Sequence, residues 1–188
     1  MPSTTHGGPR RVLPLTASRP SLLTNGTDSE LRALVSDMMA LAATAHEVRN
    51  RFGALIGVSG TQYLILNVIA RRGSSAPGLG INDVAEQLRL SGAFVTNEVN
   101  RLVAAGLVTK SSNPADRRRV VLGVTDEALR RLSELTRIQS PANDTFFDLT
   151  AYEFRQLRTL LARLAAGGDR TLLLIEHLAP DGTLDSVR

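Results

Sequence analysis

The 188-residue chain contains no cysteine, three histidines and a single lysine, Lys110. The absence of cysteine excludes a disulfide scaffold, a thiol nucleophile, a cysteine redox sensor and a cysteine-based zinc site. The histidines (His6, His46 and His177) are scattered along the chain and do not have the spacing of a metal site. No apolar run approaches the roughly 18–20 residues that a membrane-spanning helix needs, so we expect no membrane partner. The hydrophobic fraction of 43% is ordinary for a folded globular protein.

Arginine supplies 21 of the 22 basic residues, and its placement along the chain is uneven. A compositional preference for arginine with solvated charges throughout is one interpretation, and a nucleic-acid interface is the other. Residues 1–27 carry a net charge of +3 and residues 59–124 carry +4, whereas residues 28–58 carry −1 and residues 125–188 carry −2. The preference for arginine over lysine is compositional, but the confinement of positive charge to two blocks favours a nucleic-acid interface.

The N-terminal quarter of the chain is predicted to be an arm followed by a helix. Residues 1–27 are rich in Pro, Gly, Ser and Thr without periodicity, which predicts a disordered basic arm rather than a signal peptide. Thr27 and Glu30 have the T-x-x-E spacing of a capping box, and apolar residues then recur at helical spacing to about Asn50. Residues 28–58 are therefore predicted to be a helix and a linker.

Residues 59–124 have the pattern of helices followed by a β-hairpin. The N-caps predicted for the three helices are Ser59, which forms a capping box with Gln62, then Asn82 and Ser91. Gly106 is the expected C-terminal stop of the third helix. Residues 107–111 and 119–124 are predicted to be short strands on either side of a turn. Two short helices followed by a hairpin are typical of a winged helix-turn-helix.

The C-terminal third is predicted to be helical. Thr125 is expected to cap a helix that Pro141 either kinks or forces to restart. A third capping box, at Thr150 and Glu153, opens the last helical region. Gly167 and Gly168 are expected to weaken that helix before a further apolar run. Residues 150–178 are therefore predicted to form a pair of helices.

The segment at residues 81–125 combines these elements with two specific motifs. One is the L-x-x-x-G-L-V exit of the helix that follows Ser91, and the other is a wing signature, Asp116-Arg117-Arg118, that is followed by a strand and Thr125. In this order of elements the chain resembles the MarR family of bacterial transcription regulators over about residues 28–178. The resemblance implies a mainly α fold with a small β-hairpin wing, in which a winged helix-turn-helix is flanked by dimerisation helices. It also implies a homodimer on a pseudo-palindromic DNA duplex.

With this resemblance, the chain divides into five predicted parts. They are a disordered basic arm at 1–27, an N-terminal dimerisation helix and linker at 28–58, a winged helix-turn-helix at 59–124, C-terminal dimerisation helices at 125–178 and a flexible tail at 179–188. The flanking helices have more apolar surface than a small winged module can bury, which favours a dimer over a monomer with a helical cap.

The helix after Ser91 is predicted to enter the DNA major groove. Its inward residues are expected to be Val95, Val99, Leu102 and Val103. The predicted DNA-contacting residues are Ser91, Gly92, Ala93, Thr96, Asn97, Asn100 and Arg101 on this helix, and Arg117, Arg118 and Arg119 in the wing. Asn97 suits bidentate pairing with adenine, and Arg101 suits guanine or phosphate. Consecutive wing arginines suit a narrow minor groove, although a solvated polar face is the alternative for both sets.

The resemblance implies a role for Asp116, whereas the role of Phe94 stays open. The family pattern implies that Asp116 braces the wing through Arg117 or Arg118. Phe94 lies early on the helix but outside its inward stripe, so it contacts base methyls, closes an effector cleft or packs on the preceding helix.

MarR-like regulators often bind small aromatic anions between the dimer helices and the winged module. The residues predicted to line such a site here are His46, Arg49, Asn50, Phe52, Tyr63 and Leu66. An arginine and a histidine beside aromatic rings suit a carboxylate on an apolar ring, although a lone histidine is more often an ordinary, partly buried residue. The lack of cysteine argues against the peroxide-sensing branch of the family, and the few histidines argue against the zinc-sensing branch.

The sequence therefore predicts a cytoplasmic, sequence-specific, double-stranded DNA-binding regulator, a repressor that a small aromatic or anionic effector releases from its operator. The alternative is a ligand-independent architectural DNA-binding protein, whose specific-to-nonspecific affinity ratio would be near one. The chain has no P-loop, no G-x-S-x-G and no paired-carboxylate or metal motif, so we expect neither an enzyme nor a cofactor. A winged module used only for protein contacts would have a neutral recognition face, unlike this one.

Overall fold

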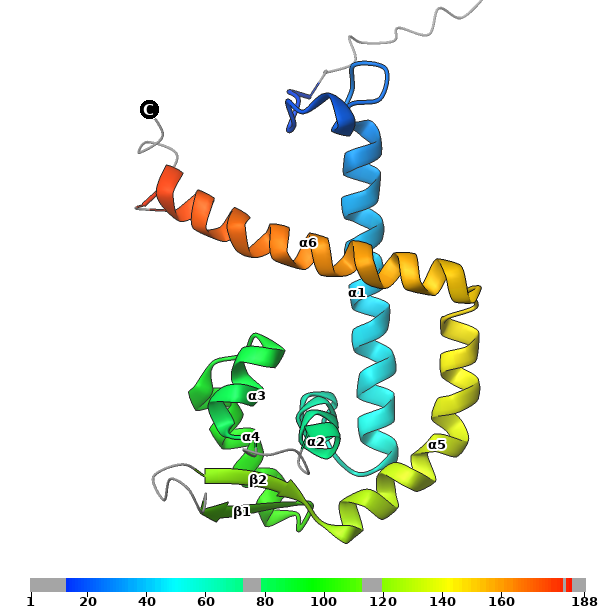
Figure 1. Ribbon diagram of the computed structural model, residues 1–188, viewed down its shortest axis with the longest axis vertical. Coiled ribbons are helices and arrows are strands. Elements are labelled where there is room, and N and C mark those ends of the chain that lie inside the picture. The colour runs from blue at the N-terminus through cyan, green and yellow to red at the C-terminus, as the bar shows by residue number, and fades with distance from the viewer. Residues whose placement is uncertain (1–12, 73–78, 113–119, 181, 184–188) are drawn as a thin grey trace, which may run out of the picture. The chain divides into compact units, whose positions relative to one another are not determined.

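The computed structural model describes residues 13–72, 79–112, 120–180 and 182–183. It divides the chain into two compact units, Met1–Leu135 and Thr136–Arg188. The elements in chain order (Figure 1) are η1 (Pro20–Leu22), α1 (Ser29–Leu55), α2 (Gly60–Arg72), α3 (Ile81–Leu88), α4 (Gly92–Ala104), β1 (Val108–Ser112), β2 (Val120–Val124), α5 (Asp126–Phe146) and α6 (Ala151–Leu178). The predicted mainly α fold with a small hairpin is confirmed.

The first unit is built around a winged helix-turn-helix. Helices α2, α3 and α4 gather beside the antiparallel β1–β2 hairpin (Figure 1), in which Val108 pairs with Val124 and Ser112 pairs with Val120. The amide of Leu122 also donates to the carbonyl of Leu79 at 2.8 Å, which attaches the hairpin to the chain before α3. The core consists of side chains that are almost fully buried: Ile65, Leu66, Val68, Ile69, Val84, Val95, Val99, Leu102, Leu107 and Leu122.

The junction between α1 and α2 brings two backbones into close contact. A Cβ atom added to Gly53 would lie 2.8 Å from the carbonyl oxygens of both Val58 and Ser59. A Cβ atom on Gly60 would clash with the side chain of Asn50. The junction is closed by the predicted capping box, because the Ser59 amide donates to Gln62 Oε1 at 3.0 Å and the Gln62 amide donates to Ser59 Oγ at 3.1 Å.

The segment before α1 has local structure where the sequence predicted disorder. The carboxylate of Asp28 accepts hydrogen bonds from the amide and the hydroxyl of Thr16, at 2.7 and 2.6 Å, and from Arg32 Nε at 3.0 Å. These bonds lower the pKa of Asp28 far below its usual range, with the Arg32 bond as the largest cause. They fasten Thr16 to the start of α1, and Arg32 Nη2 also donates to the carbonyl of Pro14 at 2.7 Å. Residues 1–12 lie outside the described part of the chain.

The capping box predicted at Thr27 and Glu30 is wrong. Helix α1 begins at Ser29, directly after Asp28, and the Thr27 hydroxyl donates to the carbonyl of Thr24. Glu30 accepts from the Thr24 hydroxyl at 2.7 Å instead of from the backbone. A tight turn that pairs Thr24 with Thr27 thus engages both side chains of the expected box.

The cap predicted at Asn82 is also wrong. Helix α3 begins two residues earlier than a cap at Asn82 predicts, at Ile81, because the Asp83 carboxylate reaches back and accepts from the amide of Gly80 at 2.7 Å. That bond satisfies one of the amides that a helix N-terminus leaves unpaired, so Asn82 lies within the first turn.

The second unit contains the end of α5 and the whole of α6. Of the two outcomes expected at Pro141, a restart is excluded, because α5 is assigned as one helix through the proline. The expected break at Gly167 and Gly168 is absent, since α6 runs uninterrupted for 28 residues. Two helical glycines cost only about 1 kcal/mol each relative to alanine, which a long helix tolerates. The capping box at Thr150 and Glu153 is confirmed by bonds of 2.8 and 3.3 Å.

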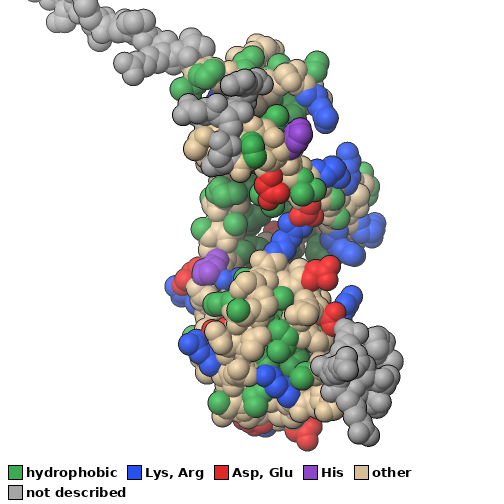
Figure 2. Space-filling model, turned by 90° about the vertical axis from the view of Figure 1, so that its left-hand side faces the viewer, with side chains coloured by type: hydrophobic (Ala, Val, Ile, Leu, Met, Phe, Trp, Pro, Cys, Tyr) green, Lys and Arg blue, Asp and Glu red, His purple; other side chains and the backbone are tan. Residues whose placement is uncertain are grey.

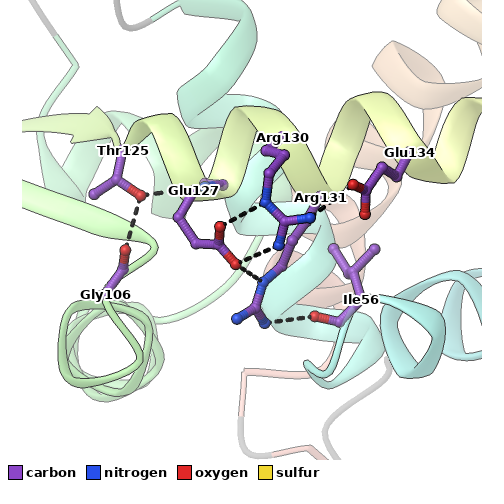
Figure 3. Close-up of polar contacts among 8 residues, drawn as sticks. Ile56, Gly106, Thr125, Glu127, Arg130, Arg131 and Glu134 are labelled. Atoms are coloured by element: carbon purple, nitrogen blue, oxygen red, sulfur yellow. Dashed lines mark hydrogen bonds and ion pairs between the residues drawn. The ribbon is translucent and has the colours of Figure 1, made fainter.

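The start of α5 is tied to two parts of the first unit (Figure 3). The Thr125 hydroxyl donates to the carbonyl of Gly106 at 2.8 Å and accepts from the amide of Ala128 at 3.2 Å, which confirms Thr125 as the cap. Arg131 Nη1 donates to the carbonyl of Ile56 at 3.0 Å, so α5 is held against the junction of α1 and α2. Glu127 accepts from Arg130 and Arg131 and orients both guanidinium groups.

Replacing Glu127 with glutamine is expected to destabilise the protein more near neutral pH than in acid. Hydrogen bonds from Arg130 and Arg131 lower the pKa of Glu127 from 4.5 to about 2 in the folded state. The ionised carboxylate therefore stabilises the fold above about pH 4.5, and this contribution is lost as the pH falls from about 4.5 to about 2. Urea unfolding of both proteins at about pH 6 and about pH 3 measures the difference.

The matched control for this substitution is Glu47→Gln, which removes the exposed pair between Glu47 and Arg51 on α1. Exposed pairs of this kind contribute little, so the control is expected to behave as the wild type. A deficit of the Glu127→Gln variant that is the same at both pH values would contradict the prediction.

Candidate nucleic-acid interface

Helix α4 rests on a buried apolar face that fixes its orientation. Ser91 caps it as predicted, because the Phe94 amide donates to Ser91 Oγ at 3.3 Å. Gly106 follows the helix with a φ of 70°, the left-handed conformation expected of a C-terminal stop. The predicted inward residues Val95, Val99 and Leu102 are at most 1% exposed.

Val103 is a wrong prediction, because it is 37% exposed. At about 100° per residue, Val103 lies some 80° around the helix axis from Val95 and therefore falls outside the buried stripe. The position that the stripe does include is occupied by Glu98, which is only 6% exposed. Phe94 is 42% exposed, so full burial against the preceding helix is not its role.

The opposite face of α4 carries the residues predicted to contact DNA. Ser91, Ala93, Asn97, Asn100 and Arg101 are exposed, whereas Gly92 and Thr96 are half-buried. The Thr96 hydroxyl donates to the carbonyl of Gly92 at 2.8 Å, which leaves its oxygen able to accept. The amide side chain of Asn97 makes no hydrogen bond with the described residues. The face is therefore polar, accessible and held by a rigid core.

Lys110 on β1 joins this face, and the sequence did not identify it. Its Nζ donates to Asn100 Oδ1 at 2.5 Å, so the hairpin places a cation beside α4. Nothing in the local sequence pairs two residues ten positions apart. Only the known register of a hairpin against the preceding helix would have found the contact.

The predicted wing residues Asp116, Arg117, Arg118 and Arg119 lie outside the described part of the chain. The described strands end at Ser112 and resume at Val120, so these four residues belong to the connection between β1 and β2. Their roles stay predictions.

Glu98 is a further residue that the sequence did not single out. Its carboxylate accepts from Gln62 Nε2 at 2.9 Å through one oxygen and from Arg101 Nη1 at 2.9 Å through the other. Two sequence signals point to it: Glu98 lies on the inward stripe between Val95 and Leu102, and it precedes Arg101 by three positions, the spacing of a helical ion pair.

The predicted effector residues gather around the junction of α1 and α2, but three of them belong to the core. Phe52 and Tyr63 are 7% and 6% exposed with ring centroids 6.0 Å apart, and Leu66 is fully buried. Asn50 lies against Gly60. His46 Nδ1 contacts Arg49 Nη2, while Arg49 Nε is buried and has no hydrogen-bond partner within the described residues. An accessible polar edge of Arg49 and His46 thus adjoins an apolar core.

Neither a metal site nor a single membrane-spanning helix is found in the part of the chain that the structure describes. No group of three His, Asp or Glu side chains in residues 13–72, 79–112, 120–180 and 182–183 is arranged to hold a metal ion. No single helix in these ranges is long and apolar enough to cross a membrane, although α1 and α2, bent by 80°, pass that test when taken together.

A helix pair whose second member presents an exposed polar face, followed by an antiparallel hairpin, defines a winged helix-turn-helix protein. A model of the MarR family matches residues 56–119, which include α2, α3, α4 and β1. The winged module of this chain is therefore similar to the MarR family. The fold and the family are those of transcription regulators rather than of enzymes.

One curated protein is similar to this chain in sequence, and solved structures are similar to it in fold. The uncharacterised HTH-type transcriptional regulator YwhA of Bacillus subtilis (strain 168) is 28% identical over 109 residues, which are 57% of this chain and 76% of YwhA. A MepR–DNA complex from S. aureus is similar in fold with a TM-score of 0.58 at 19% identity, covering 70% of this chain and 96% of MepR. CouR from Rhodococcus jostii RHA1, bound to p-coumaroyl-CoA, has a TM-score of 0.61 at 22% identity, covering 73% and 92%.

Proposed function

We propose that this protein regulates transcription by binding double-stranded DNA in a sequence-specific manner, with α4 as the recognition helix. The observation that carries the proposal is the exposed polar face of α4, on which Asn97 and Arg101 stand opposite a fully buried stripe. A helix held in this way presents amide and guanidinium groups to base edges in a major groove. The surrounding block of residues 59–124 carries a net charge of +4, which suits the phosphate backbone. A protein of similar fold, MepR, has been solved as a DNA complex.

The wing is proposed to make the second contact. Arg117, Arg118 and Arg119 are three consecutive cations between the hairpin strands, and a narrow minor groove attracts such side chains. Asp116 is proposed to brace the wing through Arg117 or Arg118. Ser91, Gly92, Ala93, Thr96 and Asn100 complete the interface on α4.

The active species is proposed to be a homodimer. Several apolar side chains of α1, and separately several of α6, are about half exposed, and Figure 2 shows apolar side chains at the surface. They include Leu34, Val35 and Met39 on α1 and Leu160, Leu161, Leu164 and Ile175 on α6. A second copy of the chain would bury the apolar side chains of each helix, and a two-fold dimer would present two α4 helices to a pseudo-palindromic operator.

Replacing Asn97 with alanine is expected to relax base preference at one position of each half-site. A bidentate pair between an amide side chain and adenine contributes about 1–3 kcal/mol of discrimination, whereas contacts to phosphate contribute none. Site selection from a randomised duplex, followed by binding to single-base variants, measures the change.

The control is Asn143→Ala, the same substitution at an exposed residue of α5 outside the proposed interface. It is expected to leave site preference unchanged. An Asn97→Ala protein that selects the wild-type sequence with the wild-type preference would exclude Asn97 as a reader of bases. A wild-type protein whose specific-to-nonspecific affinity ratio is near one would instead indicate an architectural DNA-binding protein.

Release of the DNA is proposed to depend on a small aromatic or anionic effector, which makes the protein a repressor that acts in the cytoplasm. The buried Nε of Arg49, which has no hydrogen-bond partner among the described residues, lies beside His46 and suits a carboxylate. Phe52, Tyr63 and Leu66 supply an apolar environment. CouR, which has a similar fold, was solved with p-coumaroyl-CoA bound. A thermal-shift screen of aromatic carboxylates, followed by DNA release with each hit, tests this part, because a ligand of the folded protein stabilises it by mass action.

A further inference from the structure

The buried carboxylate of Glu98 connects the junction of α1 and α2 to the outward face of α4. One oxygen accepts from Gln62 on α2, at a separation of 36 positions in the chain, and the other accepts from Arg101. Gln62 is itself held by Ser59, through the two bonds of the capping box. The side chain of Glu98 is 8% exposed, whereas that of Arg101 is 69% exposed. The series Ser59–Gln62–Glu98–Arg101 therefore runs from the junction of α1 and α2, through a buried carboxylate, to an exposed guanidinium.

The burial of the Glu98 carboxylate makes its two hydrogen bonds energetically important. A buried carboxylate is costly unless both its charge and its lone pairs are matched, and here an amide and a guanidinium match them. Leucine or valine at position 98 would continue the apolar stripe of Val95, Val99 and Leu102 at no such cost. Packing alone therefore does not explain why a charged residue occupies position 98.

The carboxylate of Glu98 affects the orientation of the Arg101 guanidinium. Glu98 engages only Nη1, and the guanidinium has no other hydrogen bond with the described residues. A guanidinium has five N–H donors in a planar fork, so the edge formed by Nε and Nη2 stays available for a bidentate contact to guanine or phosphate. The carboxylate thus restricts the rotation of Arg101 and also neutralises its charge while no DNA is bound.

We propose that Glu98 is a positioning residue for DNA recognition, which aims Arg101 at the operator and suppresses its attraction to nonspecific DNA. The inference rests on the proposed function, because it assigns Arg101 to the DNA interface. A mobile, uncompensated arginine would bind any phosphate, whereas a regulator among many competing sites depends on the ratio of specific to nonspecific affinity. Glu98 raises that ratio without touching DNA.

The experiment is a double-mutant cycle with Glu98→Gln and Arg101→Ala in the full chain. A glutamine keeps an oxygen that accepts from Gln62 but turns a donor toward the guanidinium, so it removes the Arg101 contact alone. The Glu98→Gln protein is expected to lose about tenfold in the specific-to-nonspecific ratio, the size of one bidentate base contact. Its nonspecific affinity is expected to rise, with a salt slope steeper by about 0.9 for the added phosphate contact.

The cycle separates positioning from a purely structural role. With Arg101 replaced by alanine, Glu98→Gln is expected to change neither the ratio nor the salt slope, because nothing remains to be positioned. Parallel losses of specific and nonspecific affinity, or the same change with and without Arg101, would overturn the inference. An unchanged ratio in Glu98→Gln, beside a wild type that discriminates its operator, would also overturn it while leaving the proposed function intact. A wild type that does not discriminate at all would count against the proposed function first.

A second pair of variants tests the same link if Glu98→Gln does not fold. Gln62→Leu removes the bond to Glu98 and the capping box together, whereas Ser59→Ala removes only the bond from the Gln62 amide to Ser59 Oγ. The inference expects a lower ratio for Gln62→Leu and a wild-type ratio for Ser59→Ala. Equal effects of the two variants would show that only the capping box matters.

Discussion

Alanine at Gly53 is expected to destabilise the first unit by about 3 kcal/mol, a large effect for a single added methyl group. The new Cβ would lie 2.8 Å from the carbonyl oxygens of Val58 and Ser59. Backbone oxygens cannot rotate away as a side chain can, so α1 and α2 must separate to accommodate the methyl group. Urea unfolding monitored by tyrosine fluorescence measures the loss. The chain has no tryptophan and two tyrosines, so a Tyr152→Phe background leaves Tyr63, beside the junction, as the reporter.

The control for this prediction is Gly168→Ala in α6, where an added Cβ would meet nothing within 4 Å. Alanine is the better helix former by about 1 kcal/mol, so this variant is expected to be neutral or stabilising. A Gly53→Ala protein as stable as the wild type would show that the junction of α1 and α2 is looser than the structure has it.

Glutamate at Leu164 is expected to raise the dimer dissociation constant about 1000-fold, which corresponds to about 4 kcal/mol. Leu164 is 50% exposed on the apolar face of α6, so dimerisation through that face would bury two carboxylates without partners. A monomer holds only one recognition helix, and its affinity for a palindromic operator should fall in parallel. Sedimentation velocity gives the dissociation constant, and fluorescence anisotropy with a labelled operator gives the affinity.

The matched control is Ala166→Glu, which lies two residues further along α6 and therefore on the opposite side of the helix. Its surroundings include Arg155, Arg158 and Arg163, which share a surface hollow with Ala166 and favour a carboxylate. The control is expected to dimerise and bind DNA as the wild type does. A Leu164→Glu protein that stays dimeric would remove α6 from the proposed interface, and a monomeric wild type would exclude the dimer.

Local signals predicted the elements of this fold where the interacting groups are close in the chain. The boxes at Ser59 and Thr150, the cap at Ser91 and the stop at Gly106 each involve residues within about four positions, so spacing alone identifies them. The failures at Thr27 and Asn82 have one cause. In both cases a neighbouring side chain or turn forms a competing hydrogen bond, and a rule based on spacing alone does not include such competition.

For the candidate interface too, local periodicity predicted some residues correctly and missed those that depend on distant contacts. Helical periodicity places Asn97, Asn100 and Arg101 on the outward face of α4, and the structure has all three exposed. Periodicity also placed Val103 inward, although it lies outside the buried stripe and is 37% exposed. Lys110 was missed because only folding brings it near Asn100. The helical stripe and the spacing to Arg101 point to Glu98, but its contact with Gln62 depends on folding.

The sequence by itself determined the class of fold, the position of α4 and the block of positive charge. It also determined the preference for arginine over lysine, of which there is one. Those features are encoded in apolar periodicity, capping spacings and composition, which act over one or two helical turns. The tertiary structure decided how α1 meets α2, which polar groups are buried and how Arg101 is held. These depend on contacts such as Gln62 with Glu98 and Arg131 with Ile56. Such pairs form only when the hydrophobic core has packed, because burial is what makes an unmatched carboxylate or carbonyl costly.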